Sequence, residues 1–308
     1  MSGSRTCDSA AMDLEDLRVF TVLAELEHVT GAAATLRMPQ STLSRTLARL
    51  EAELGTPLFD RPGRRVRLNA YGRAFREHAQ RALAEVDAGT RRVTSLRDPD
   101  GGCVRLGFVG SLGTWLVPLL LTHYRRHVTR TTIQLTAASS DVLADLLLGG
   151  RLDLVLLGPR PVHPDLDWVP LAEEQLCLSV PAGHRLAGRS SVALAEAAGE
   201  PFLSYQADTG MRQISDELCR AAGIDPAVTL ESSDVATVDA LVAAGMGVAL
   251  RPGDRGGSRP PGVVHVPLAE ARARREVGLA RARHRTGPAA VTRFRELAIA
   301  AAAAERHP

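Results

Sequence analysis

The stretch QSTLSRTLARLEAEL, residues 40–54, decides the fold of the amino-terminal region. Its leucines at positions 43, 47, 50 and 54 recur at three- and four-residue spacing, which places them on one face of a helix that Gly55 ends. The opposite face is small, polar and cationic, with Ser41, Arg45 and Ala48 flanked by Thr42, Ser44 and Arg49. Such a face is typical of a helix in the DNA major groove, where hydroxyl and guanidinium groups reach base edges and phosphates. An ordinary surface helix is the alternative.

Two further helices are predicted upstream of this one. The first is indicated by apolar residues at helical spacing, namely Leu14, Leu17, Phe20, Leu23 and Leu26. Thr30 is expected to cap the second, an alanine-rich helix at 31–37, and Met38 and Pro39 form a tight break before Gln40. Helices joined by a tight break predict a helix-turn-helix.

Downstream, the segment FDRPGRRVRL at 59–68 predicts a short basic hairpin. The Pro-Gly pair at 62–63 supplies its turn, because glycine adopts the positive φ that such turns need. Val66 and Leu68 should then point inward, while Arg65 and Arg67 point outward. A basic wing beside a helix-turn-helix contacts phosphates or the minor groove.

The region between Arg37 and Arg76 is strongly basic. Nine arginines against three acidic residues give it a net charge of +6, whereas the whole chain carries +2. A local excess of this size is what a polyanionic partner requires, although a solvated charged surface would show it too.

Several separate segments of this region together resemble the LysR-type transcriptional regulators. They are DLEDLRVF at 13–20, TGAAATLR at 30–37, QSTLSR at 40–45 and LEAELGTPLFDR at 50–61, and the similarity runs without a gap to Asn69. Two positions depart from the family pattern, since Pro39 stands where serine is common and Ser41 where proline is common. The fixed φ of Pro39 suits a helix start, so these departures bear on base preference and not on the fold.

The resemblance implies a winged helix-turn-helix that binds double-stranded operator DNA. The residues expected to contact DNA are Thr30, Arg37, Gln40, Ser41, Thr42, Ser44, Arg45, Arg49, Arg61, Arg64, Arg65 and Arg67. RNA polymerase is a further expected partner if the protein activates transcription. Activation and repression are both open.

A long helix is predicted from 70 to 96, where no proline interrupts the chain. Its apolar and small residues form a heptad seam at Phe75, Ala79, Ala82, Val86, Gly89, Val93 and Leu96. A single helix of about 40 Å, whose seam consists in about half of alanine and glycine, would bury little apolar surface as a monomer. We therefore expect it to pair with a second copy. This resembles the dimerising linker helix of the LysR family and predicts a homodimer or homotetramer. Packing of the helix on its own domain is the alternative.

The remainder alternates strands and helices, which predicts an α/β fold with a parallel sheet. Strands are expected at 103–109, 133–137 and 152–157, with helices at 113–127 and 141–148. A second lobe should start near Asp167, with strands at 176–180, 201–204, 228–231 and 248–251. The chain should then return to the first lobe through a strand at 276–282 and a closing helix at 291–303.

Two phrases in this region resemble the LysR effector domain, which is similar to periplasmic binding proteins. They are LLGGRLDLVLL at 147–157 and TVDALVAAGMGVAL at 237–250. The expected organisation is a disordered extension at 1–11, a winged helix-turn-helix at 12–69, a linker helix at 70–98 and an effector-binding domain at 99–308. Within the last, lobe I comprises 103–166 and 267–303, and lobe II comprises 167–266.

A small-molecule effector, with an anionic or carbonyl oxygen, is expected between the lobes at Ser111. Ligands of open α/β sheets bind beyond the carboxyl ends of strands, and the N–H groups of a following helix start favour an anion there. The same logic selects Ser139, Ser140, Ser204, Tyr205, Thr209 and Arg212. The alternative is that Ser111 merely caps its helix. The glycines at 107, 110 and 113 are not spaced G-x-G-x-x-G, so a nucleotide site is disfavoured.

Other chemistry finds little support in the sequence. The four cysteines, at 7, 103, 177 and 219, and the scattered histidines lack metal-ligand spacing, so we expect no metal or other cofactor and buried or idle thiols. No catalytic constellation is evident, although an enzyme or a solute-binding protein built on the two-lobed domain is the rival interpretation. Residues 1–12 lack the apolar core of a signal peptide, which predicts a cytoplasmic protein.

Overall fold

The computed structural model describes residues 12–60, 66–97, 101–128, 130–255 and 260–306. The expected disordered extension at 1–11 lies outside these residues, as do the tip of the hairpin at 61–65 and the predicted hinge at 98–100. The chain divides into two compact units, residues 1–90 and 91–308. We describe each unit by itself.

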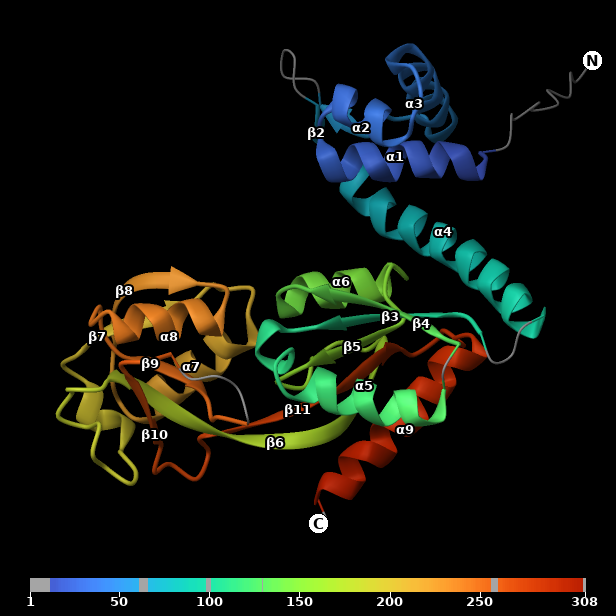
Figure 1. Cartoon of the computed structure of the whole chain (residues 1–308). Helices are drawn as coiled ribbons and strands as arrows, with labels where there is room; N and C mark the ends of the chain where they lie inside the picture. Colours follow the sequence, from blue (N-terminus) through green and yellow to red (C-terminus); the bar gives the residue numbers. More distant parts are fainter. Residues whose placement is uncertain (1–11, 61–65, 98–100, 129, 256–259, 307–308) are drawn as a thin grey trace, which may run out of the picture. The chain divides into compact units, whose positions relative to one another are not determined.

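The amino-terminal unit is the expected winged helix-turn-helix (Figure 1). It contains α1 (Leu14–Leu26), α2 (Val29–Thr35), α3 (Gln40–Leu54), the strands β1 (Phe59–Asp60) and β2 (Arg67–Leu68), and most of α4 (Ala70–Arg97). The leucine stripe of α3 packs on Phe20 and Leu23 of α1, and Gly55 ends α3 with a φ of 70°. Phe59 pairs with Leu68 across the antiparallel hairpin. Val66 and Leu68 are buried and Arg67 is exposed, as predicted.

The start of α2 corrects one prediction. The cap is His28 and not Thr30, because Nδ1 of His28 accepts a hydrogen bond from the Gly31 N–H at 3.0 Å. The helix therefore begins at Val29 and leaves Arg37 in the turn to α3, where its φ is 53°.

Helix α4 forms as expected, but its seam divides into two parts. Phe75 lies 5.1 Å from Phe20 between ring centroids and packs, with Ala79, in the core of the amino-terminal unit. Val86 and Val93, farther along the helix, are 41% and 62% exposed. The first half of the seam therefore belongs to its own domain, and only the second half is available to another copy. The Leu96 side chain lies outside the described part of the chain.

The first lobe of the carboxy-terminal unit is a sheet covered by helices on both faces. Its elements are β3 (Cys103–Phe108), the 3₁₀ turn η1 (Gly110–Leu112), α5 (Leu116–His127), β4 (Thr132–Ala137), α6 (Ser140–Leu148), β5 (Leu154–Leu157), β11 (Arg274–Ala282) and α9 (Ala289–Arg306). Strand β3 is parallel to β4 and β5, whereas β11 is antiparallel to β5. Alternate residues of β5 face opposite sides, so Leu154 and Leu156 pack with α5 and α9, and Val155 and Leu157 pack with α6.

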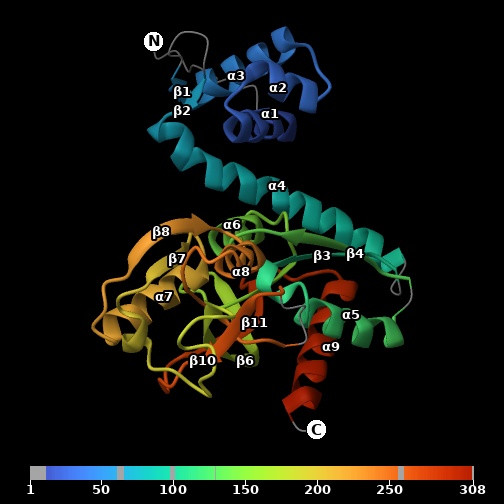
Figure 2. The same ribbon diagram turned by 60° about the vertical axis from the view of Figure 1, so that its left-hand side comes forward.

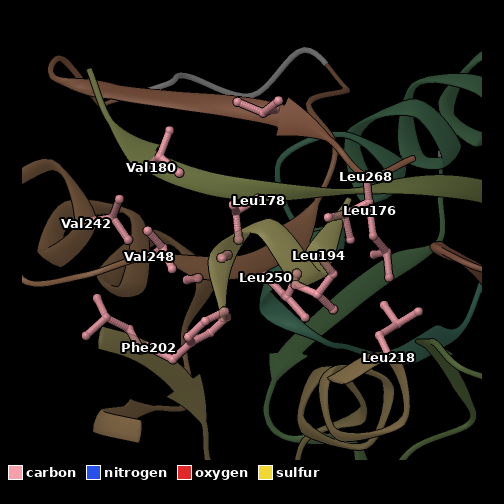
Figure 3. Packing of buried hydrophobic residues seen from close by; sticks show 14 of the residues in the cluster. Leu176, Leu178, Val180, Leu194, Phe202, Leu218, Val242, Val248, Leu250 and Leu268 are labelled. Carbon is pink, nitrogen blue, oxygen red and sulfur yellow. The ribbon is translucent and has the colours of Figure 1, made fainter. Parts of the chain in front are cut away.

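The second lobe surrounds its own apolar core. It contains η2 (Leu194–Ala197), β7 (Pro201–Tyr205), α7 (Gly210–Ala221), β8 (Ala227–Ser232), α8 (Val235–Ala243), β9 (Ala249–Pro252) and β10 (Val263–Pro267). Among these strands β10 was not predicted, and no bounds were predicted for the helices of this lobe. Strands β7 and β8 run parallel and side by side (Figure 2). Figure 3 shows Leu178, Val248 and Phe202 meeting in this core with Leu194 and Leu250.

One long strand, β6 (Leu166–Pro181), belongs to both lobes. From Leu166 to Gln175 it pairs with β11, and from Leu176 onward it pairs with β9 and β10. The second lobe therefore begins partway along β6 and not near Asp167, because the strand continues unbroken through the expected boundary. No helix in the described residues is long and apolar enough to span a bilayer.

Candidate DNA-binding face and interlobe cleft

The polar face of α3 is presented as the sequence predicts. Gln40, Ser41, Ser44 and Arg45 are exposed, while Leu43, Leu47 and Leu50 of the opposite stripe are buried. Nε2 of Gln40 donates to Oγ1 of Thr30 at 3.0 Å, which joins the first turns of α3 and α2. Ser41 and Arg45 lie one helical turn apart, and Nε of Arg45 donates to the Ser41 carbonyl at 3.2 Å. These groups form a continuous polar surface suited to base edges and phosphates.

Arg49 has a different role from its neighbours. It forms an ion pair with Asp16, whose side chain is only 1% exposed, and lies 3.5 Å from Asp13. The hydrogen bond to Asp16 and its charge raise the pKa of Arg49. Asp13 and Asp16 form the capping box of α1, so Arg49 ties α3 to the start of α1. Its guanidinium is thereby engaged in an ion pair of the domain itself, although the side chain is 50% exposed.

The remaining predicted DNA contacts fall into three groups. Thr42 is half-buried at the start of α3, and Arg37 is exposed in the preceding turn. Arg67 is exposed on β2, next to the buried Leu68. Arg61, Arg64 and Arg65 lie outside the described residues.

A pocket of about 40 Å³ lies between the two lobes. Five of the seven predicted effector contacts line it, namely Ser111, Ser139, Ser140, Tyr205 and Thr209. The lobes approach closely here, since the Gly210 N–H donates to Oγ of Ser140 at 3.3 Å. A Cβ atom on Gly210 would lie 2.5 Å from the Gly158 carbonyl oxygen, so only glycine permits this approach.

Three helices begin at the pocket. Ser139 is the N-cap of α6, Thr209 of α7 and Asp234 of α8, and all three residues line the space. Helix starts carry unpaired N–H groups and a partial positive charge, which together favour an anionic group.

Two predicted residues, Ser204 and Arg212, do not line the pocket. Ser204 is buried one position before Tyr205 on β7, and adjacent strand residues point to opposite faces. The Arg212 guanidinium binds Glu231 at 2.7 Å and also Asp216 at 2.9 Å, and these two hydrogen bonds raise its pKa. Its backbone N–H instead bonds Oγ1 of Thr209 at 3.3 Å, which helps cap α7.

Ser111 is not a helix cap. Helix α5 begins at Leu116 behind an N-cap at Trp115, and Ser111 lies in the 3₁₀ turn that follows β3 directly. This corrects the expected helix start at 113 and removes the capping alternative. Oγ of Ser111 accepts a hydrogen bond from Nη2 of Arg275 at 2.9 Å.

Arg275 is the pocket residue that sequence reasoning missed. It is 2% exposed, lines the pocket and donates from Nε to Glu174 at 2.5 Å. The run RARRE at 272–276 suggests a solvated surface, which hid this residue. The sequence signal is alternation, because the run of charged residues is interrupted at every second position by a residue that is buried, namely Ala273, Arg275 and Val277, where β11 begins.

Other polar groups of this unit serve the structure. Burial raises the pKa of Tyr205 far above its usual range, and its hydroxyl donates to the Leu250 carbonyl at 2.9 Å. His265 contacts Asp239 and Asp254 inside the second lobe at 3.3 and 2.8 Å. Within the described part of the chain, no group of three acidic, histidine or cysteine side chains is arranged to hold a metal ion.

A winged helix-turn-helix followed by a two-lobed domain with a pocket between its lobes defines a DNA-binding regulator with a ligand-binding sensor. Residues 14–73 match the family model "Bacterial regulatory helix-turn-helix protein, lysR family". Residues 97–303 match the model "LysR substrate binding domain". The chain belongs to the LysR family of transcriptional regulators, which are not enzymes. The resemblance seen in the sequence is confirmed.

Curated relatives of this chain are transcriptional regulators. The uncharacterized regulator YybE of Bacillus subtilis is 40% identical over 246 residues, covering 80% of this chain and 84% of the relative. The dual regulator GltC of the same organism is 31% identical and covers 94% and 97%. A probable hydrogen peroxide-inducible genes activator of Mycobacterium avium is 32% identical and covers 77% and 76%.

Solved structures of similar architecture include full-length regulators. CbnR superposes with a TM-score of 0.70 at 25% identity, covering 94% of this chain and 99% of that chain. CbnR in complex with its target DNA gives a TM-score of 0.68, and full-length BenM gives 0.61 at 26% identity. The protein is thus a regulator with a DNA-binding helix-turn-helix and an effector-binding domain.

Proposed function

We propose that α3 reads the operator and that a small molecule with an anionic group binds in the interlobe pocket and modulates DNA binding. The observation that carries the effector site is the convergence of three helix N-termini with Ser111 and Arg275 on one small pocket. The observation that supports the reading helix is its exposed Gln40, Ser41 and Arg45 above a buried leucine stripe. Effector binding would favour one arrangement of the oligomer over another and so change how the DNA is held.

We further propose that two or four copies assemble through the exposed second half of the α4 seam. Val86 and Val93 offer apolar surface that a single copy leaves in water. If the protein activates transcription, RNA polymerase is a further partner. We place the protein in the cytoplasm.

The effector proposal is tested by filling the pocket. Ser233 lines it, and Ser233→Phe would occupy most of a space of about 40 Å³. We expect this variant to retard DNA from upstream of its own gene as the wild type does. In cells with the wild-type protein, expression of a reporter driven by that DNA should change between growth media that differ in effector level. In cells with Ser233→Phe this change should be lost. A medium response equal to the wild type's would count against this pocket as the effector site.

A further inference from the structure

Arg275 and Glu174 form a buried ion pair on the two strands that join the lobes. They are direct partners in the register of β11 and β6, and each side chain is about 2% exposed or less. The bonds to Glu174 and Ser111 use two of the five N–H donors of the guanidinium. A buried guanidinium with donors to spare, lining a pocket, is a receptor for a planar carboxylate.

A carboxylate of the protein lies on another side of the same pocket. Oδ2 of Asp234 caps α8 by accepting bonds from N and Oγ1 of Thr237 at 2.8 and 2.9 Å. Oδ1 is directed at the opposite lobe, 3.7 Å from the position that a Cβ atom would take on Gly110. Because the cap uses Oδ2, Oδ1 is available to a hydrogen-bond donor of a ligand.

The charges of the pocket select against ligands of several kinds. Glu174 neutralises Arg275, so the positive potential comes from the three helix starts, and Asp234 opposes it. One carboxylate is accommodated, a second one would meet Asp234, and an uncharged ligand would leave the donors poorly matched. The small volume excludes bulky ligands while the lobes are in this arrangement.

We propose that the effector is a small carboxylate that also carries an amino or hydroxyl group. Its carboxylate binds Arg275 and Ser111, and its amino or hydroxyl group donates to Oδ1 of Asp234. This inference rests on the proposed function, because it assigns a chemical class to the effector of the same pocket.

The test uses calorimetric titration of the full chain with three-carbon probes. L-Alanine and L-lactate carry the proposed pair of groups, propionate lacks the donor, malonate has a second carboxylate, and lactamide lacks the charge. We expect alanine or lactate to bind at least about tenfold more tightly than the other three, since a charge-assisted hydrogen bond contributes about 1.5–3 kcal/mol. Tighter binding of alanine than of lactate would identify the effector as an amino acid, and tighter binding of lactate would identify it as a hydroxy acid.

Two variants locate the recognition. Asp234→Asn keeps a good N-cap residue and removes the charge that repels a second carboxylate. The affinity for malonate relative to that for lactate should therefore rise by about tenfold in this variant. The double variant Glu174→Gln/Arg275→Gln keeps a neutral buried pair, and its DNA retardation serves as the folding control. We expect it to bind none of the five probes measurably.

Several outcomes would overturn the proposal. These are equal binding of lactamide and lactate, equal binding of malonate and lactate to the wild type, or no binding of any probe at millimolar concentration. If Ser233→Phe abolishes the medium response while the probes fail, the effector pocket is retained and only the chemical class is wrong. If Ser233→Phe leaves the response intact, the proposed function itself fails.

Discussion

The guanidinium of Arg49, on the helix predicted to read DNA, is bound to the buried carboxylate of Asp16 on α1. Arg45, one turn earlier, contacts only a backbone carbonyl of its own helix among the described residues. Two arginines of one helix, alike in the sequence, therefore differ in availability. Arg49 stabilises the packing of α3 on α1, and Arg45 remains free to engage a base or phosphate.

The first prediction separates these two roles. Arg45→Ala should weaken specific operator binding by about 1–3 kcal/mol if it makes a bidentate base contact, with little change in melting temperature. Arg49→Ala should lower the melting temperature, because it leaves the buried Asp16 without its partner. Gel-retardation titrations and thermal melts measure the two effects. Unchanged operator affinity in Arg45→Ala would show that this residue is not a reader.

The second prediction concerns the wing. Arg67 is exposed on β2, and we expect Arg67→Ala to weaken binding to operator and unrelated DNA alike. The slope of log affinity against log salt should fall by about 1 for one lost phosphate contact. Arg65→Ala, at the neighbouring outward position of the predicted hairpin, should behave in the same way. A loss confined to the operator sequence would contradict a phosphate contact.

The third prediction concerns self-association. Val93→Asp places a charge in the exposed part of the α4 seam, where pairing would bury it at a cost of several kcal/mol. Sedimentation velocity should therefore show a shift toward monomer. Thr94→Asp is the matched control, because it adds the same charge one residue away from the seam. Identical sedimentation of the two variants would argue against pairing through this seam.

The fourth prediction compares two hydroxyl residues of the pocket. Thr209 caps α7, so Thr209→Val should lower stability by about 1 kcal/mol whatever the ligand. Ser111 caps no helix, so Ser111→Ala should melt near the wild-type temperature and still bind the operator. Its reporter should require about tenfold more inducer, since a hydrogen bond to a charged ligand is lost. A full response at the original inducer concentration would remove Ser111 from the site.

The fifth prediction concerns thiol chemistry, since one relative is named as a peroxide-inducible activator. Burial raises the pKa of the Cys219 thiol to about 11, and burial also raises the pKa of Cys103. Because the thiolate is the reactive form and pH 7 lies far below the raised pKa of Cys219, these groups should stay protonated and resist oxidation.

We therefore expect hydrogen peroxide to leave operator retardation unchanged in a Cys7→Ser background, which removes the one cysteine outside the described residues. Native labelling with iodoacetamide should modify Cys177 and Cys219 only after unfolding, because both are 5% exposed. A peroxide-dependent change in retardation would overturn this expectation.

The sequence predicted best what local periodicity specifies. The leucine stripe of α3 and the alternation of strands with helices depend on neighbours in the chain, so their periods are visible directly. Ser111, Ser139, Ser140 and Thr209 could be placed because strand ends and helix starts follow from the same pattern.

What the sequence did not predict depends on distant partners. Arg275 meets Glu174 across 101 positions of the chain, and no local pattern states that pairing. The same holds for β6, whose two halves pair with different strands although its sequence runs on without a break. Arg49 resembled a DNA contact because its partner, Asp16, lies 33 positions earlier on another helix.

The pairing of β6 with β11 also sets an order for the folding of the effector unit. The whole second lobe, from β7 to β10, lies between these strands in the chain. During synthesis the second lobe is therefore complete before the ribosome has delivered β11, which the first lobe needs between β5 and β6. Until then the strand edges of β5 and β6 lack their central neighbour, and closing the sheet depends on a contact about a hundred residues distant. A nascent chain stalled before Arg274 would thus hold a finished second lobe beside an unpaired, aggregation-prone first one.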